Sequence, residues 1–310
     1  MALPTLTGKE WTFLLLTLFQ LLACNATYAL FAPFFPIVAV DYGITQNGVA
    51  FLFSSFAATQ FLTSIIAGPL ATRFGRRVVL GVGVALISVG SVAFGLAPDM
   101  APAGTILVTL LALARMVQGT GAALASVCMD AILADAFPKN RGFVLSLAGS
   151  CGGLAWAIGP PLGGKLFVLG GFRLPFLCAG ALPPLVNVLM VPFFPESAKT
   201  PSAKSPKASD SADRSSKIDC SQVRELAAVP LLWLIPLCTQ LSQGCKWSTF
   251  DIGIALWVTD EFGFSISEAS TCFSVVSLAW CFGAPIMGSI SDRFASSRLV
   301  FVIFGLVVVG

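Results

Sequence analysis

The sequence predicts an all-α polytopic membrane protein, and its composition, its long apolar segments and its loop charges all support that fold class. Of the 310 residues, 56% are hydrophobic and 11% are charged, and the mean hydropathy is +0.88. A soluble chain of this length could not bury so much apolar surface in one core. A protein with several membrane spans needs no such core, because lipid is its solvent.

The apolar segments are long enough to cross a bilayer as helices, which takes roughly 20 residues each. We count eight complete spans and the start of a ninth, near 11–40, 47–71, 78–97, 103–135, 142–169, 173–194, 229–258, 266–291 and from 298 onward. The last apolar run reaches Gly310 without a polar tail. We therefore expect a C-terminal truncation, with a genuine nine-span protein as the alternative.

The charged residues of the loops predict the orientation of the chain. Alternate loops are basic, with Arg73, Arg76, Arg77, Lys139, Arg141, six residues from Lys199 to Arg224, Arg293 and Arg298. The opposite loops carry Asp41, Asp99, Asp260, Glu261 and Glu268, and only Lys165 and Arg173 run against this trend. Because basic loops stay on the cytoplasmic side, the N-terminus and the loops after spans 2, 4, 6 and 8 are predicted to be cytoplasmic. We expect an integral protein of either a vesicular or other internal membrane or the plasma membrane.

An internal repeat predicts two parallel halves of six helices each. The segments Gly68-Pro69-Leu70-Ala71-Thr72-Arg73-Phe74 and Gly288-Ser289-Ile290-Ser291-Asp292-Arg293-Phe294 lie 220 residues apart, each at the end of a span. Such repeats are common in transporters. Residues 195–228 are rich in Ser, Lys and Pro and predict a disordered cytoplasmic linker. The expected domains are thus an N-terminal bundle at 1–194, the linker at 195–228, and the first part of a second bundle at 229–310.

Three motifs resemble signatures of the major facilitator superfamily: Gly68-x-x-x-Thr72-Arg73-x-Gly75-Arg76-Arg77, Arg115-x-x-Gln118-Gly119-x-Gly121, and Gly159-Pro160-x-x-Gly163-Gly164. The third resembles the motif of the proton-coupled antiporter branch. The resemblance implies the major facilitator fold, with the second half incomplete here, and transport by alternating access. The chain departs from the family pattern at two positions. Thr72 stands where an acidic residue is usual, although the second copy keeps such a residue as Asp292. Ala155 stands where a glycine is usual.

Within that superfamily, the chain is most similar to the vesicular amine transporters, including their polyamine-transporting member, and it shares much with the drug:proton antiporters. The residues that carry this similarity are Pro33-Phe34-Phe35-Pro36, Ala134-Asp135-Ala136-Phe137-Pro138 and Asp251.

Arg115 and Asp130 are charged residues within the fourth predicted span. They are separated by about 22 Å along a helix, so each needs a partner on another helix. Burying an arginine in mid-span costs at least ~2.5–3.5 kcal/mol on insertion scales. The functional interpretation is that Arg115 faces a central cavity and senses the protonation of a neighbouring acid. The alternative is a structural arginine that binds backbone carbonyls and Gln118.

Asp251, in the seventh span, is the candidate proton carrier. Burial favours the neutral form of a carboxyl group, and the same group could also hold a cationic substrate. The alternative is an aspartate near the outer membrane interface. Lys246 lies five residues earlier, about 140° around the helix, so we expect it to pair with an acid elsewhere.

The basic loop after the second span is a candidate gate. Asp135, at the inner end of the fourth span, is placed to meet Arg73, Arg76 or Arg77, and a pair made in one conformation and broken in another would bias the equilibrium between them. The alternative is that these arginines only set the orientation. Gly68 and Gly75 would permit a tight turn or a close helix contact, and Asp292 and Arg293 repeat the motif in the second half.

The fifth predicted span contains a stripe of small residues, Gly149, Gly152, Gly159 and Gly163, within roughly 80° of its surface. Such a stripe lets helices approach closely in lipid, and Pro160 adds a bend. We expect a tight hinge against a helix of the other half, with plain helix packing as the alternative. Trp156 shares the stripe and either faces a cation or packs.

The sequence therefore predicts a secondary active transporter, most simply a proton-coupled antiporter of an organic cation such as an amine, a polyamine or a drug. One alternative is a facilitator or symporter of a neutral or anionic solute that binds Arg115 and Lys246. Another is a non-transporting receptor with the same fold. The sequence has no histidine, no metal-ligand spacing and no nucleophile triad, so we expect no enzyme, no metal and no cofactor. The expected partners are a small-molecule substrate, protons and the lipid bilayer. We expect no nucleic acid partner, and we expect the protein to be a monomer.

Overall fold

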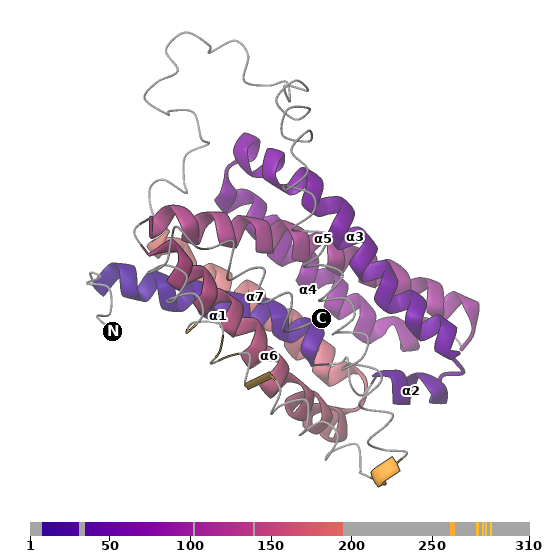
Figure 1. The fold of residues 1–310 in the computed structure, drawn as a ribbon. Coiled ribbons are helices and arrows are strands. Elements are labelled where there is room, and N and C mark those ends of the chain that lie inside the picture. Colours follow the sequence, from indigo (N-terminus) through magenta and orange to yellow (C-terminus); the bar gives the residue numbers. More distant parts are fainter. Residues whose placement is uncertain are drawn as a thin grey trace, which may run out of the picture. The chain divides into compact units, whose positions relative to one another are not determined.

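The structure, a computed structural model, describes residues 8–30, 35–101, 103–138 and 140–194, together with positions 261–263, 277, 278, 281, 283 and 286. Within residues 8–194 every regular element is a helix (Figure 1). The helices are α1 (Gly8–Ala29), α2 (Phe35–Asp41), α3 (Gln46–Phe74), α4 (Arg76–Met100), α5 (Thr105–Ala136), α6 (Arg141–Gly170), α7 (Arg173–Met190) and the short 3₁₀ helix η1 (Val191–Phe193). These helices lie together in one compact unit.

In the described part of the chain, six helices are long and apolar enough to cross a membrane, namely α1 and α3 to α6, and α7 with η1. Predicted spans 2 to 6 agree with α3 to α7 within a few residues. The first span was predicted wrongly as one helix over 11–40, because α1 ends at Ala29 and α2 begins at Phe35. Pro33 and Pro36 lack the N–H group that a continuous helix would need there. The linker 195–228 and predicted spans 7 to 9 lie outside the described residues, apart from the few positions named above.

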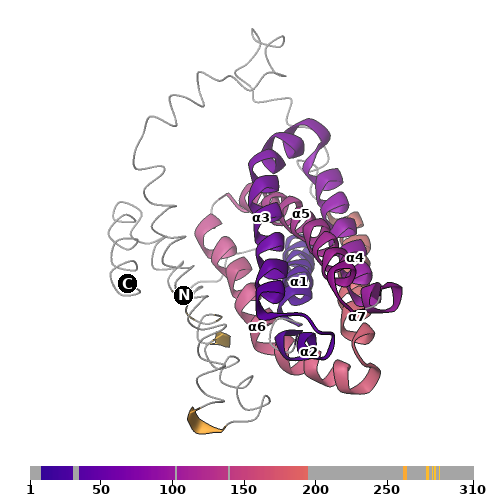
Figure 2. The same ribbon diagram turned by 90° about the vertical axis from the view of Figure 1, so that its right-hand side faces the viewer.

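The helices pack in two groups, α3 to α5 and α1 with α6 and α7, which the contact of α4 with α7 joins. The most extensive contacts join α4 to α5 and α3 to α5, while α1 packs against α6 and α7 (Figures 1 and 2). Glycines bring α4 and α5 together: a methyl group on Gly83 would lie 2.8 Å from the backbone N of Ala125, and one on Gly121 would lie 2.7 Å from that of Ile87. Close backbone contact through small residues is typical of helices packed in lipid.

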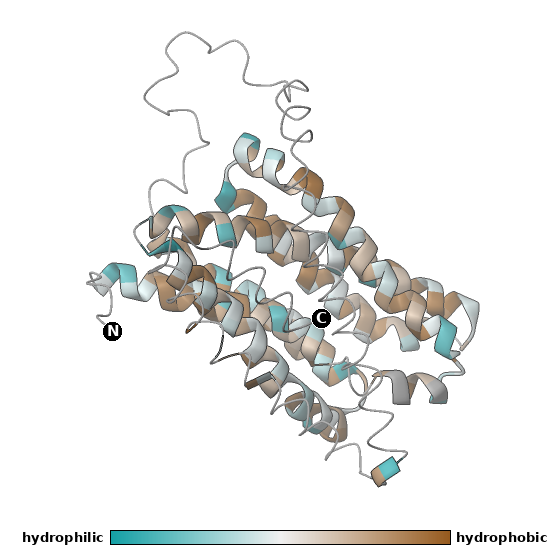
Figure 3. Cartoon of the chain, in the orientation of Figure 1, coloured by the Kyte–Doolittle hydropathy of each residue, from teal (hydrophilic) through white to brown (hydrophobic). Residues whose placement is uncertain are grey.

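Much of the outer surface of these helices is apolar, as the predicted membrane spans require. Figure 3 shows hydrophobic colouring along much of α3 and α5. On α3, Phe61 is 67% exposed and Ile65 is 63% exposed. Side chains of this kind are stable against lipid or further protein but not against water.

Two hydrophobic clusters fill the interior and leave a polar layer between them. One cluster contains Leu14, Val84 and Met129, and the other contains Phe94 and Leu111 with several further phenylalanines. Along α5 the second cluster ends at Ala114, and the first begins at Leu124. Arg115 and Gln118 lie in the interval between the two clusters, near the middle of the bundle.

Candidate functional site

Arg115 is fully enclosed in the middle of α5. Its side chain is 1% exposed, and it is the largest fully buried side chain among the described residues. Nη1 donates a hydrogen bond of 2.7 Å to Oε1 of Gln118, one turn further along α5. The guanidinium carbon lies 4.7 Å from the ring centre of Phe94 and 5.8 Å from those of Tyr28 and Phe56. The cation is thus held among three rings, which come from α4, α1 and α3 and attract it through their π faces.

Gln118 connects this arginine to α4. Its Nε2 donates to Oγ of Ser91 at 2.7 Å, and the Ser91 hydroxyl donates to the carbonyl oxygen of Ile87 at 2.8 Å. Arg115, Gln118 and Ser91 are all buried. The result is a continuous chain of hydrogen bonds from the guanidinium to the backbone of α4.

An aromatic cluster extends from the arginine across α1, α3 and α6. The Tyr28 ring centre lies 5.1 Å from that of Phe56, 6.0 Å from that of Phe53 and 5.6 Å from that of Trp156. Trp156 therefore packs against a ring that itself contacts Arg115. Sequence reasoning missed Tyr28, because the chain's 26 phenylalanines and 6 tryptophans hide any single aromatic position, although Tyr28 is one of only two tyrosines.

Asp135 forms an ion pair at the end of the bundle where α3 meets α4, which we call the basic end. Its partner is Arg76, which also donates to the carbonyl oxygen of Ala131 at 3.0 Å. Arg141 Nη2 lies 4.0 Å from the Asp135 carboxylate, and Arg141 Nε donates to the carbonyl oxygen of Ala134 at 2.7 Å. Two arginines thus hold the last turn of α5, where cations also complement the helix dipole.

The other residues of the loop motif have separate roles in this conformation. Gly75 joins α3 to α4 with a φ of 86°, which favours glycine. Gly68 has open space around it. The guanidinium of Arg77 lies 5.4 Å from the ring centre of Phe194, and that of Arg73 lies 5.3 Å from its neighbour Phe74. The expected contact with Asp135 is therefore made by Arg76 among the three arginines.

The glycine stripe of α6 packs against α1. A methyl group on Gly159 would lie 2.8 Å from Cβ of Ala29, and one on Gly163 would overlap the carbonyl oxygen of Leu30. Among the described residues, the close partner of these two glycines is thus α1 and the residue after it, in the same bundle. The expected contact with a helix of the other half stays a prediction, because that half lies outside the described residues, apart from the few positions named above. Sequence periodicity identifies the stripe but not the helix that faces it. Gly149 has open space, and Gly152 is only in loose contact with Asn25.

The remaining predicted site residues are not brought into this cluster. Asp130 is exposed, and among the described residues it has no ion-pair partner. Pro160 is buried within α6. Asp251, Lys246, Asp292 and Arg293 lie outside the described residues.

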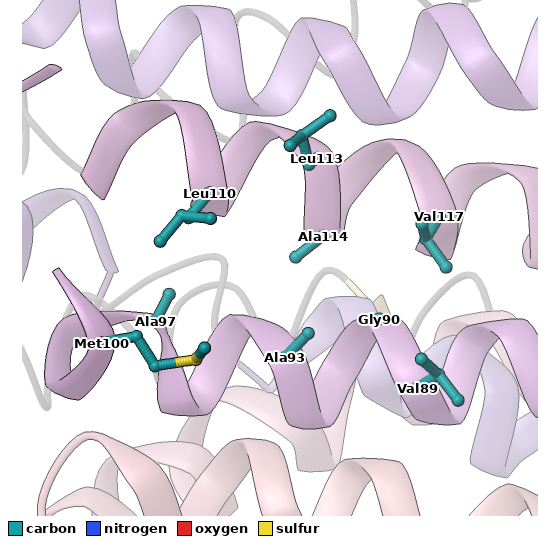
Figure 4. A pocket seen from close by; sticks show the side chains of 9 residues that line it. All are labelled: Val89, Gly90, Ala93, Ala97, Met100, Leu110, Leu113, Ala114 and Val117. Atoms are coloured by element: carbon teal, nitrogen blue, oxygen red, sulfur yellow. The ribbon is translucent and has the colours of Figure 1, made fainter. Parts of the chain in front are cut away.

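An apolar groove runs between α4 and α5 on the outside of the bundle. Figure 4 shows Leu110 and Ala114 of α5 pointing toward α4. The residues that line it are Val89, Gly90, Ala93, Ala97, Met100, Leu110, Leu113, Ala114 and Val117. None of these side chains is polar, so the groove offers nothing to recognise a charged substrate.

Comparison with known proteins places this arrangement in a family. The sequence profile of the Major Facilitator Superfamily matches residues 16–310. The chain belongs to that superfamily. Like other major facilitators it is a multi-pass integral membrane protein of a transporter family and not an enzyme.

The major facilitators that it resembles include two kinds of protein. The MFS-type transporter SLC18B1 of Rattus norvegicus is 27% identical over 299 residues, which cover 96% of this chain and 62% of the relative. The SLC18B1 protein of Mus musculus is 26% identical over 96% of this chain and 61% of its own length. The quinolone resistance protein NorA of Staphylococcus aureus (strain MRSA252) is 27% identical over 164 residues, or 51% of this chain and 39% of NorA. The chain therefore spans about 62% of the length of the SLC18B1 proteins.

Proposed function

We propose that this major facilitator is a proton-coupled antiporter that moves an organic cation by alternating access. The observation that carries the proposal is the contact of α6 with α1 at Gly159 and Gly163, which leaves no room for a side chain. These glycines belong to the motif that resembles the antiporter branch. A coupled antiporter must prevent leakage of protons and solute, and a contact without space for water serves that purpose.

The similarity to SLC18B1 and NorA supports the choice of substrate. The first is named as a transporter, and the second is named for resistance to quinolones. We propose an amine, a polyamine or a drug-like cation as the substrate of this chain. The proposed partners are therefore that small molecule and protons, and we propose a monomer within the lipid bilayer.

Asp251 is the proposed proton carrier, and we propose that the charge of Arg115 acts on it electrostatically, without direct contact. A guanidinium in a low-dielectric interior stabilises a nearby carboxylate and is repelled by a bound cation. Proton and substrate would then compete for Asp251, so that only one of them crosses in each direction. The role of Asp251 is proposed from the sequence alone, whereas the burial of Arg115 supports the role proposed for the arginine.

The surroundings of Arg115 disfavour the alternative of an anionic substrate. Rings from three helices and the amide of Gln118 surround the guanidinium, and its side chain is 1% exposed. An anion would have to displace these groups before it reached the charge.

The other alternative is a receptor with the same fold that does not transport. Such a receptor would bind ligand but show no flux, so a transport assay distinguishes it from the proposed antiporter.

The charge distribution supports a cytoplasmic N-terminus. Lys9 lies in the first turn of α1, and Phe13 contacts Phe194 at a ring-centre distance of 6.0 Å. Because Phe194 also contacts Arg77, the start of α1 lies at the basic end. Basic ends of membrane helices face the cytoplasm. We therefore propose that the basic end is cytoplasmic.

Uptake into proteoliposomes tests the proposal. We expect the full-length protein to accumulate radiolabelled serotonin, spermidine or norfloxacin in vesicles with an acidic interior, and we expect an ionophore that dissipates the pH gradient to abolish this uptake. Asp251→Asn should lose gradient-driven accumulation, because an amide cannot carry the proton. Asp260→Asn, in the neighbouring predicted loop, is the matched control. Uptake that ignores the pH gradient, or that persists in Asp251→Asn, contradicts the coupling.

The ion pair at the basic end gives a second test. Asp135→Asn is expected to change stability by less than about 1 kcal/mol, because the pair is partly exposed. It should nevertheless change the initial uptake rate by about two- to fivefold if the pair stabilises one conformation over the other. Asp99→Asn is the matched control, since Asp99 pairs with Arg173 at the opposite end and is similarly exposed. Equal effects of the two substitutions on uptake would argue against a gate at Asp135.

A further inference from the structure

Ser91 occupies a position in α4 that decides how the Gln118 amide is oriented. The Ser91 hydroxyl has one proton, and it donates that proton to the carbonyl oxygen of Ile87 at 2.8 Å. Toward Gln118 it can therefore only accept, and it accepts from Nε2 at 2.7 Å. Ser91 is 0% exposed, so water does not compete for these bonds.

The orientation of this amide determines what Arg115 meets. With Nε2 committed to Ser91, Oε1 faces the guanidinium and accepts from Nη1 at 2.7 Å. The two ends of an amide have nearly the same shape, but the reverse orientation would direct N–H groups at N–H groups. We propose that Ser91 is a positioning residue that fixes Gln118, and through it Arg115, in the orientation needed for coupling transport to protons.

Gly90 provides the space for this arrangement. A methyl group at that position would lie 2.6 Å from Cγ of Gln118 and 2.8 Å from the carbonyl oxygen of Ala114. Gly90 thus admits the Gln118 side chain, while Ser91 supplies its acceptor. Gly90 and Ser91 are neighbours on α4, and together they provide the space and the hydrogen-bond acceptor for the Gln118 side chain of α5.

The same face of α4 also restricts the position of the Arg115 guanidinium. Phe94, one turn after Ser91, places its ring centre 4.7 Å from the guanidinium carbon. From the other helices, Tyr28 of α1 brings a titratable phenol group, and Phe56 of α3 brings an apolar ring. This inference rests on the proposed function. Its consequence is that loss of the Ser91 hydroxyl frees Arg115 to move and weakens its electrostatic coupling to Asp251, the proposed proton carrier.

The matched comparison is Ser91→Ala against Ser150→Ala. Both serines are buried and donate to the carbonyl oxygen four residues earlier in their own helix, at 2.8 Å for Ser91 and 3.1 Å for Ser150. Only Ser91 is also an acceptor for Gln118. The two substitutions therefore differ in the bond that the proposal concerns.

In proteoliposomes of the full-length protein, Ser91→Ala is expected to lower pH-driven accumulation of radiolabelled spermidine, serotonin or norfloxacin about tenfold, the factor that corresponds to one net hydrogen bond. Exchange of labelled for unlabelled substrate at equal pH should stay within about twofold of the unmodified protein, because it needs no coupling. A purely structural role would reduce both processes together. Ser150→Ala should change neither. Equal behaviour of the two variants in accumulation overturns the proposal.

Thermal unfolding separates this inference from the proposed function. In a double-substitution cycle on the full-length protein in detergent, the shifts of Ser91→Ala and Gln118→Leu should be non-additive, and those of Ser150→Ala and Gln118→Leu should add. If the unmodified protein exchanges substrate but ignores a pH gradient, proton coupling fails, and this cycle alone tests the Ser91–Gln118 link. Additive shifts for Ser91 and Gln118 would overturn that link whether or not transport is coupled.

Discussion

Gly163→Ala is expected to destabilise the protein strongly, whereas Gly164→Ala next to it is expected to be neutral or stabilising. A methyl group on Gly163 would overlap the carbonyl oxygen of Leu30 and lie 2.9 Å from its carbon, so α6 would have to move away from α1. Insertions into a packed contact typically cost about 1–3 kcal/mol, and backbone atoms cannot move aside as side chains do. Gly164 has open space, and there alanine gains about 0.8–1.0 kcal/mol of helix propensity.

Thermal unfolding of the two variants, measured on the full-length protein in detergent, checks this opposite sign. We also expect Gly163→Ala to leak protons across proteoliposomes if the α1–α6 contact forms the seal proposed above. Gly164→Ala should retain the proton tightness of the unmodified protein. A Gly163→Ala protein that unfolds at the unmodified temperature would show that α6 does not approach α1 as closely as described.

The spans from α3 to α7 could be predicted from sequence because lipid simplifies the problem. A spanning helix must satisfy its own backbone hydrogen bonds, and the bilayer sets its length, so an apolar run of the right size is nearly sufficient. The separation of α1 from α2 was missed although Pro33 and Pro36 signal it. Hydropathy alone does not register a proline within an apolar run.

The candidate site was only partly predictable, because local patterns do not say which helices face each other. Arg115 stands out in apolar sequence, and Gln118 follows it one turn later on the same face. Ser91 and Phe94 become partners only through the register of α4 against α5, which close contacts such as Gly90 with Ala114 determine. The spacing of residues along the sequence does not reveal this register of α4 against α5.

Arg115→Met is expected to abolish pH-driven accumulation while leaving the protein folded. A buried arginine costs at least ~2.5–3.5 kcal/mol on insertion scales, which offsets much of what its bond to Gln118 and its ring contacts contribute. Methionine fills a similar volume and packs well against aromatic rings. Stability should therefore change by no more than about 2 kcal/mol, since the gain from removing the charge is set against an amide left without its donor. Accumulation should fall on the order of 100-fold, the factor for losing a hydrogen bond to a charged group.

Two further variants identify the property of Arg115 that matters. Arg115→Lys keeps the charge but loses the planar fork that donates to Gln118 and lies against Phe94, so we expect partial accumulation. Lys165→Met is the control, because it removes an exposed cation from a spanning helix and should leave accumulation unchanged. Parallel measurement of thermal unfolding and uptake distinguishes the outcomes. If Arg115→Met still accumulates substrate, the arginine is a structural element of the aromatic cluster, and the proton carrier works without it.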